Sequence, residues 1–221
     1  MAVAWIDQGI SLSEFNQYER AKIALETGLK IEPNHSSALV NLCAAFNKIG
    51  NYQDALTACE GALQTDGNLY ESDPADAYLQ KGQALAGLSR YEEAITSIDT
   101  ALNLKPESAI AWNTKSVILW QAQNYREALQ ANDRALALDQ NYFQGWFNRG
   151  GILRAIQQNQ EALAAYERAV NSDISLVYAA TLASVWANRS AILWNLGKYQ
   201  MNEKIRIKLK SYNHTVVNND D

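Results

Sequence analysis

Histidine and cysteine, which often act as metal ligands, bases or nucleophiles, are scarce in this chain of 221 residues. The two histidines are His35 and His214, and neither lies near a cluster of cysteines or carboxylates at metal-site spacing. His35 follows Pro33 and Asn34, which indicates a residue in a surface turn. The sequence also lacks a phosphate-binding Gly-x-x-x-x-Gly-Lys loop and a Gly-x-Ser-x-Gly motif. It therefore predicts a protein that is not an enzyme and needs no metal or cofactor.

The two cysteines, Cys43 and Cys59, fall on the two halves of one repeated unit. Cys43 occupies a position held by small residues in the other units, and Cys59 occupies a packing position, so both are expected in the core. Nothing nearby would lower a thiol pKa, although a redox pair remains an alternative. The N-terminus does not resemble a secretion signal. We therefore expect free thiols in a reducing compartment and a cytoplasmic protein.

The overall charge argues against two classes of partner. A net charge of −5 does not attract nucleic acid or an anionic membrane. No apolar run approaches the roughly 20 residues of a membrane-spanning helix. Carboxylates are concentrated on the predicted second helices, where they form a solvated face. The sequence thus predicts neither nucleic acid nor membrane as a partner.

Short phrases recur along the chain at a nearly constant spacing. One alanine position repeats at intervals of 34, 39, 34 and 34 residues, at Ala21, Ala55, Ala94, Ala128 and Ala162. A tryptophan position near the start of the unit is occupied in four units, by Trp5, Trp112, Trp146 and Trp186. Apolar residues inside each unit recur three and four apart, and pairs such as Gly50-Asn51 break the pattern. Each unit is therefore predicted to be two helices that pack antiparallel.

This recurring W…G…Y…A…A…P pattern resembles the tetratricopeptide repeat family over roughly residues 2–200. The resemblance implies an all-α, right-handed superhelical solenoid of antiparallel helix pairs, with first helices lining a concave groove. We expect five full repeats, at about 2–35, 36–69, 75–108, 109–142 and 143–176. A partial sixth repeat at 177–197, a capping helix at 198–214 and a disordered tail at 215–221 would follow. A basic interaction tail or an isolated strand remains an alternative to the cap.

Two departures from the period carry structural expectations. Asp73 and Pro74 follow an insertion and together favour a helix start, with Asp as N-cap and Pro in the first turn. Six additional residues precede the sixth unit in "DISLVYAATLASVW" and contain no Gly or Pro. We therefore expect a longer loop before Asp73 and an N-terminal extension of the sixth first helix.

The resemblance also implies where a ligand would bind. The family's groove positions, transferred residue by residue, select carboxamides, one cation and aromatic rings: Asn41, Gln80, Asn113, Trp120, Phe147, Asn148, Arg154, Asn188 and Trp194. Further polar groove positions are Asn47, Lys48, Gln83, Thr114 and Gln121. A carboxamide offers a donor and an acceptor that match the peptide group, and large aromatic side chains can anchor a ligand. We therefore predict a non-catalytic scaffold that binds a protein or an extended peptide in the concave groove.

Several alternatives remain at this stage. A clamp for the terminal carboxylate of chaperone tails is not expected, because no window around Asn41 or Asn148 supplies its cations. An RNA-binding helical repeat is poorly supported, since the groove positions include only Lys48 and Arg154 as cations. A self-associating adaptor could pair through residues 1–12 or the cap, giving a homo-oligomer. A scaffold that uses surfaces other than the groove is the remaining interpretation.

Overall fold

The computed structural model describes residues 1–64, 73–172 and 179–195, with side chains of the last helix described for 183–193. Within these ranges the chain is all helical and contains no strand. The helices are α1 (Ala2–Glu14), α2 (Tyr18–Leu29), α3 (Ser36–Ile49), α4 (Tyr52–Gln64), α5 (Pro74–Gly87), α6 (Tyr91–Leu104), α7 (Ala109–Gln121), α8 (Tyr125–Leu138), α9 (Phe143–Ala155), α10 (Asn159–Asn171) and α11 (Ala179–Asn195). The predicted all-α class is confirmed.

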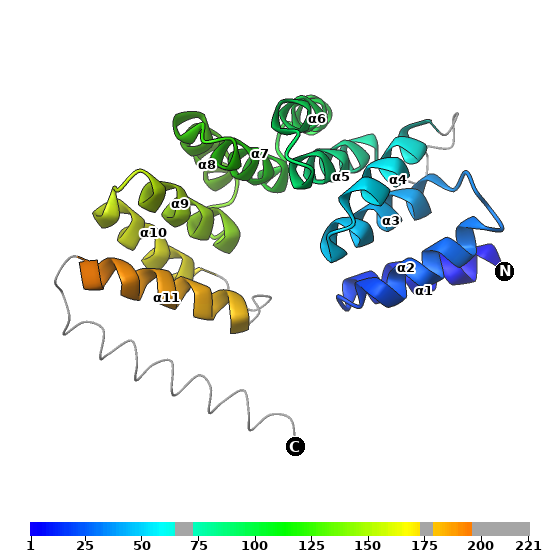
Figure 1. Ribbon diagram of the computed structural model, residues 1–221, viewed down its shortest axis with the longest axis horizontal. Helices are drawn as coiled ribbons and strands as arrows, with labels where there is room; N and C mark the ends of the chain where they lie inside the picture. Colours follow the sequence, from blue (N-terminus) through cyan, green and yellow to red (C-terminus); the bar gives the residue numbers. More distant parts are fainter. Residues whose placement is uncertain (65–72, 173–178, 196–221) are drawn as a thin grey trace, which may run out of the picture. The chain divides into compact units, whose positions relative to one another are not determined.

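The helices form two compact units, Met1–Ala131 and the chain from Asn132 onward, which divide within α8. We call the odd-numbered helices first helices and the even-numbered ones second helices. In the first unit α1, α3 and α5 each pack against the second helix that follows, and α2, α4 and α6 each pack against the next first helix. Successive first helices also contact one another, in the order α1, α3, α5 and α7 (Figure 1). In the second unit α10 packs against both α9 and α11. The predicted packing of consecutive helix pairs is confirmed in both units.

The turns that join the two helices of the first five pairs share one backbone conformation. A residue just after each first helix adopts a left-handed φ, between 58° and 83°, at Asn16, Gly50, Ser89, Gln123 and Gln157. The next amide then donates back to a carbonyl in the last turn of the first helix, as from Asn124 N to Leu119 O at 2.8 Å. This geometry satisfies carbonyls that would otherwise lack a partner and reverses the chain in two or three residues.

The helix starts show how side chains fix the repeat boundaries. Asp73 Oδ1 accepts a hydrogen bond of 2.8 Å from Ala75 N, with Pro74 in the first turn, as the sequence predicted. Asp73 also pairs with Lys105 Nζ at 2.6 Å, and this hydrogen bond lowers the pKa of the carboxyl. His35 is half-buried, and its Nδ1 accepts a bond from Ala38 N. The predicted turn histidine is therefore the N-cap of α3. The predicted long loop before Asp73 lies outside the described residues.

Small residues sit where the two helices of a pair cross. The five recurring alanines, from Ala21 to Ala162, are all fully buried. At Gly82 a Cβ atom would lie 2.5 Å from Ile98 Cδ1, and at Gly150 it would lie 2.6 Å from Tyr166 Cε1. These contacts are shorter than a van der Waals approach, so the helices can meet only where the side chain is small.

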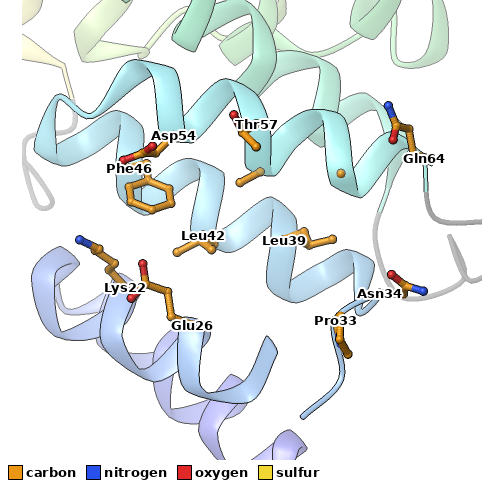
Figure 2. Close-up of a pocket in the computed structure, with 12 residues that line it drawn as sticks. Lys22, Glu26, Pro33, Asn34, Leu39, Leu42, Phe46, Asp54, Thr57 and Gln64 are labelled. Carbon is orange, nitrogen blue, oxygen red and sulfur yellow. The ribbon is translucent and has the colours of Figure 1, made fainter. Parts of the chain in front are cut away.

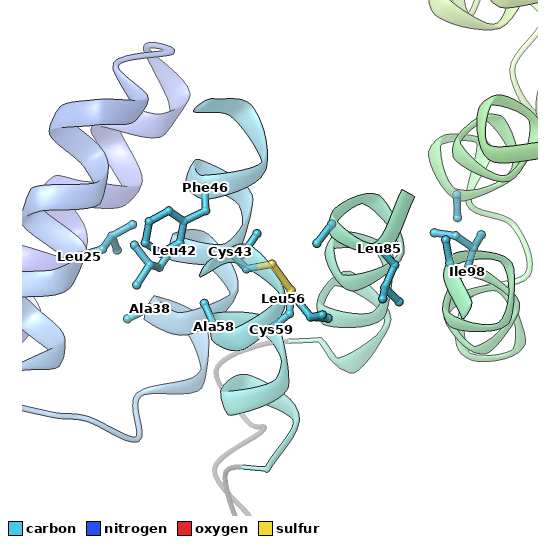
Figure 3. Close-up of a cluster of buried hydrophobic side chains, with 14 of the residues drawn as sticks. Leu25, Ala38, Leu42, Cys43, Phe46, Leu56, Ala58, Cys59, Leu85 and Ile98 are labelled. Atoms are coloured by element: carbon cyan, nitrogen blue, oxygen red, sulfur yellow. A yellow bond between two sulfur atoms is a disulfide. The ribbon is translucent and has the colours of Figure 1, made fainter. Parts of the chain in front are cut away.

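The cysteines occupy this same crossing in the second pair. Cys43 on α3 and Cys59 on α4 are buried and form a disulfide, with Cα atoms 5.4 Å apart (Figure 3). The predicted core location is confirmed, but the predicted free thiols are wrong. The two cysteines are close enough to bond because they occupy the positions of Gly82 and Ile98, which are in contact in the next pair. The cysteines therefore give no support for a reducing compartment, and a cytoplasmic location remains a prediction.

The disulfide gives the first testable prediction. Closing a loop of 16 residues should stabilise the fold by roughly 2–4 kcal/mol, mainly by restricting the unfolded chain. Urea unfolding with and without a phosphine reductant should therefore show a lower midpoint when the bond is reduced. The double variant Cys43→Ala/Cys59→Ala should not respond to reductant. Two reactive thiols in the unreduced, denatured protein would contradict the disulfide.

A second prediction concerns the helix crossing. Ala128 is fully buried, and its carbonyl accepts a hydrogen bond of 2.8 Å from Ser116 Oγ on α7. Ala128→Leu should push α7 and α8 apart and reduce the free energy of unfolding by roughly 1–3 kcal/mol. Arg126→Leu, an exposed change on the same helix, is the control and should have little effect. Equal thermal melting of the Ala128→Leu variant and the wild type would refute this placement.

Candidate functional site

The first helices α3, α5 and α7 share a hollow of about 320 Å³ in the first unit. We call it the first-helix hollow. Six of the predicted groove residues line it together: Asn47, Lys48, Gln83, Asn113, Thr114 and Gln121. Tyr52, Ala86, Gly87, Val117 and Ile118 complete the lining. The structure therefore brings carboxamides from three successive repeats into one depression.

Asn47 links two first helices and retains an unused acceptor. Its Nδ2 donates to Gln80 O at 2.9 Å and to Gln80 Oε1 at 3.2 Å. Both acceptors are oxygen atoms of Gln80 that lie near Asn47 Nδ2. This contact therefore assigns the nitrogen and the oxygen of the Asn47 carboxamide. Asn47 Oδ1 is buried and has no hydrogen-bonding partner among the described residues. A buried acceptor without a partner costs about 1–3 kcal/mol.

Three other predicted ligand residues of the first unit do not line this hollow. Asn41 Nδ2 donates to Ser37 O at 2.9 Å within its own helix. Gln80 is engaged by Asn47, and the ring of Trp120 is half-buried. Asn113, which does line the hollow, is itself buried. The carboxamides thus serve helix-to-helix contacts as well as the open surface.

In the second unit Phe147 belongs to a cluster of rings. It stacks on Phe143 with ring centroids 6.3 Å apart and lies 5.9 Å from the ring of Tyr166. Tyr166 is buried, which raises the pKa of its hydroxyl. Phe147 therefore contributes to packing in addition to any role as an anchor.

Arg154 and Asn188 are joined across neighbouring repeats. Arg154 is exposed, and its guanidinium donates to Asn188 Oδ1 at 2.6 Å. Asn148 is half-buried on the helix that carries Arg154. The side chain of Trp194 lies outside the described residues, as do the predicted cap and tail. The structure thus couples two of the predicted ligand residues directly.

A larger hollow was not predicted from the sequence. It measures about 920 Å³ and lies between the second helices α2 and α4, over the first helix α3 (Figure 2). We call it the second-helix hollow. The signal that would have revealed it is Leu39, which stands where most other repeats carry tryptophan.

The described residues show no arrangement suited to metal binding. No group of three or more His, Cys, Asp or Glu side chains in the described ranges is placed to hold a metal ion. None of the described helices is long and apolar enough to cross a membrane.

Comparison with known proteins agrees with this architecture. The tetratricopeptide repeat pattern matches residues 6–77, 79–143 and 120–176. The chain belongs to the tetratricopeptide repeat family. Members of this family are generally non-catalytic scaffolds used for protein–protein interaction. Among curated proteins, none matches the sequence.

Solved tetratricopeptide repeat structures share the fold at low identity. A thermophilic repeat protein of Thermus thermophilus is 19% identical, with a TM-score of 0.71 over 88% of this chain and 100% of that one. Pseudomonas aeruginosa pilF is also 19% identical, with a TM-score of 0.70 over 96% of this chain and 91% of that one. YrrB, described as having an unusual peptide-binding site, is 19% identical, with a TM-score of 0.54 over 77% of this chain and 86% of that one.

The ring cluster gives a prediction that separates packing from binding. Phe147→Ala should lower the free energy of unfolding by about 2–3 kcal/mol, less than the roughly 3–5 kcal/mol of a fully buried phenylalanine. Gln144→Ala, an exposed change on the same helix, should leave the unfolding midpoint nearly unchanged. If both variants unfold like the wild type in urea, Phe147 does not stabilise the repeat.

Proposed function

We propose that this tetratricopeptide repeat protein is a non-catalytic scaffold that binds an extended peptide segment of a protein in the first-helix hollow. The observation that carries the proposal is the hollow itself, which is lined by carboxamides of three successive repeats.

The chemistry of the lining favours a peptide over other ligands. Asn47, Gln83 and Gln121 come from three helices, so their carboxamides are spaced along the hollow. An extended peptide presents N–H and C=O groups at regular intervals, and each carboxamide can serve either group. Lys48 is the single cation of this lining, which is too little charge to hold a phosphate backbone. YrrB, described as having a peptide-binding site, shares the fold and supports this choice.

Self-association is a second candidate, and exposed apolar residues of α1 favour it. Val3 and Trp5 expose 54% and 40% of their surfaces, and Phe15 just beyond the helix exposes 74%. Exposed apolar groups of this kind can pair with a second copy. Sedimentation of the wild type and of Trp5→Ser would test this candidate. A mass that corresponds to one chain at every concentration would exclude it.

The groove proposal is tested with peptides selected from a random displayed library on the wild-type protein. Gln83→Ala and Gln121→Ala should each weaken the selected peptides by roughly 0.5–1.5 kcal/mol, the net value of one hydrogen bond. Asn47→Ala should weaken them more, since it also breaks the link to Gln80. Trp120 does not line the hollow, so a loss of about 2 kcal/mol or more in Trp120→Ala would show that the peptide extends beyond it. Calorimetric titration measures each affinity.

The control is Glu92→Ala, an exposed change on the second helix α6. It should leave the affinity for the selected peptides unchanged. Equal affinity for the wild type and all three carboxamide variants would refute binding in the first-helix hollow, and loss with Glu92→Ala alone would move the site to α6.

A further inference from the structure

The second-helix hollow is the place where the chain departs from its own repeat. Figure 2 shows α3 as its floor, with Leu39, Leu42 and Phe46 between the walls formed by α2 and α4. None of its lining residues belongs to the first-helix hollow, so the inference below does not rest on the proposed function.

The first departure is the position of Leu39. The other repeats that follow a preceding pair hold an aromatic residue there: Tyr78, Trp112, Trp146 and Trp186. Two of these rings are fixed by their indole nitrogens, from Trp112 Nε1 to Pro106 O at 2.9 Å and from Trp146 Nε1 to Gln140 O at 2.8 Å. A ring is therefore missing from the second repeat.

The second departure lies three residues further, at Leu42. The third to sixth repeats hold a cation there, and each cation pairs with a carboxylate on the preceding second helix: Lys81 with Glu60, Lys115 with Asp99, Arg149 with Asp133 and Arg189 with Glu167. The carboxylate of the second repeat's hollow is Glu26 on α2. It has no ion pair with any described residue, because its usual partner position holds a leucine. A cation is thus missing beside the missing ring.

We propose that the second-helix hollow docks a helical segment of a partner protein that carries an aromatic residue and, three residues later, a lysine or arginine. This is the spacing at which the chain fills the same place in other repeats, with Trp112 and Lys115, Trp146 and Arg149, or Trp186 and Arg189. Residues three apart lie side by side on a helix, so one face of the partner presents both groups. The ring would cover Leu39 and Leu42, and the cation would reach Glu26.

The walls of the hollow suit this occupant. Its charged lining residues are Lys22, Glu26 and Asp54, which leaves a negative balance. The Lys22 amine lies 5.4 Å from the centre of the Phe46 ring, so it is held against the floor. A Cβ atom at Gly61 would lie 3.7 Å from Leu39, an ordinary van der Waals contact, so the side chain of Leu39 lies beside this glycine of α4.

The probe is an alanine-rich peptide of about 16 residues, long enough to form some helix, with one Trp and an Arg three residues later. Fluorescence anisotropy of the labelled peptide measures its affinity for the full chain. Replacing the peptide's Trp by Ala should weaken binding about 30-fold or more, as expected of an aromatic anchor. Replacing its Arg by Gln should weaken binding about two- to fivefold, as expected of a partly exposed ion pair.

Two protein variants locate the peptide. Leu39→Trp supplies the ring found in other repeats and should reduce binding about 30-fold or more by filling the hollow. Glu26→Lys should reverse the charge preference, so that a peptide with Glu in place of Arg binds better than the original. Glu92→Lys on α6 is the matched control and should not change the affinity.

Three results would overturn the inference. One is the absence of peptide binding to the wild type, and another is unchanged affinity in both Leu39→Trp and Glu26→Lys. The third is a wild-type dimer that Leu39→Trp dissociates, which would show that a second copy of this chain occupies the hollow. Circular dichroism shows whether each variant is folded. If Leu39→Trp does not fold, Glu26→Lys still tests the inference.

Discussion

The close crossing of two helices within each pair is the contact on which the rest of this structure depends. At the crossing the first helix presents a small residue and the second helix packs a larger one against it, as Gly82 does with Ile98 and Gly150 with Tyr166. A helix pair has too little interior to bury its apolar stripe alone, so its outer faces must be covered by the neighbouring pairs. The small residue sets the distance between the helices, and that distance decides which surfaces remain for the next repeat.

The disulfide is a covalent version of this crossing. Cys43 takes the place of the small residue and Cys59 that of the larger one, and a covalent bond joins them where the other pairs have non-covalent contacts. Around it, residues such as Leu25, Leu56, Leu85 and Ile98 form one apolar cluster that runs through the first repeats (Figure 3). The second repeat is therefore held at its centre by a bond, while its outer surface lacks both the ring and the cation that repeats three to six carry.

Contacts between successive repeats follow two different rules. On the first-helix side they are polar, as between Asn47 and Gln80 or Arg154 and Asn188, and they consume carboxamides that could otherwise bind a ligand. On the second-helix side they combine a ring with an ion pair, as at Trp186 and Arg189. Among the described residues, Asn47 Oδ1 lacks a hydrogen-bonding partner and Glu26 lacks an ion pair, and both residues line a hollow.

The sequence alone determined the helix pairs, their period and the small residues at their crossings, because these depend on local spacing and recur in every copy. It also determined the helix start at Asp73 and Pro74, which requires only neighbouring residues. Only the tertiary structure decided which groove residues share a hollow, since Asn113 lines it while Gln80 is engaged by Asn47 from another helix. It also decided that Cys43 meets Cys59 and that Leu39 leaves an open space. Those outcomes depend on distances between side chains of different helices, which a single sequence does not contain.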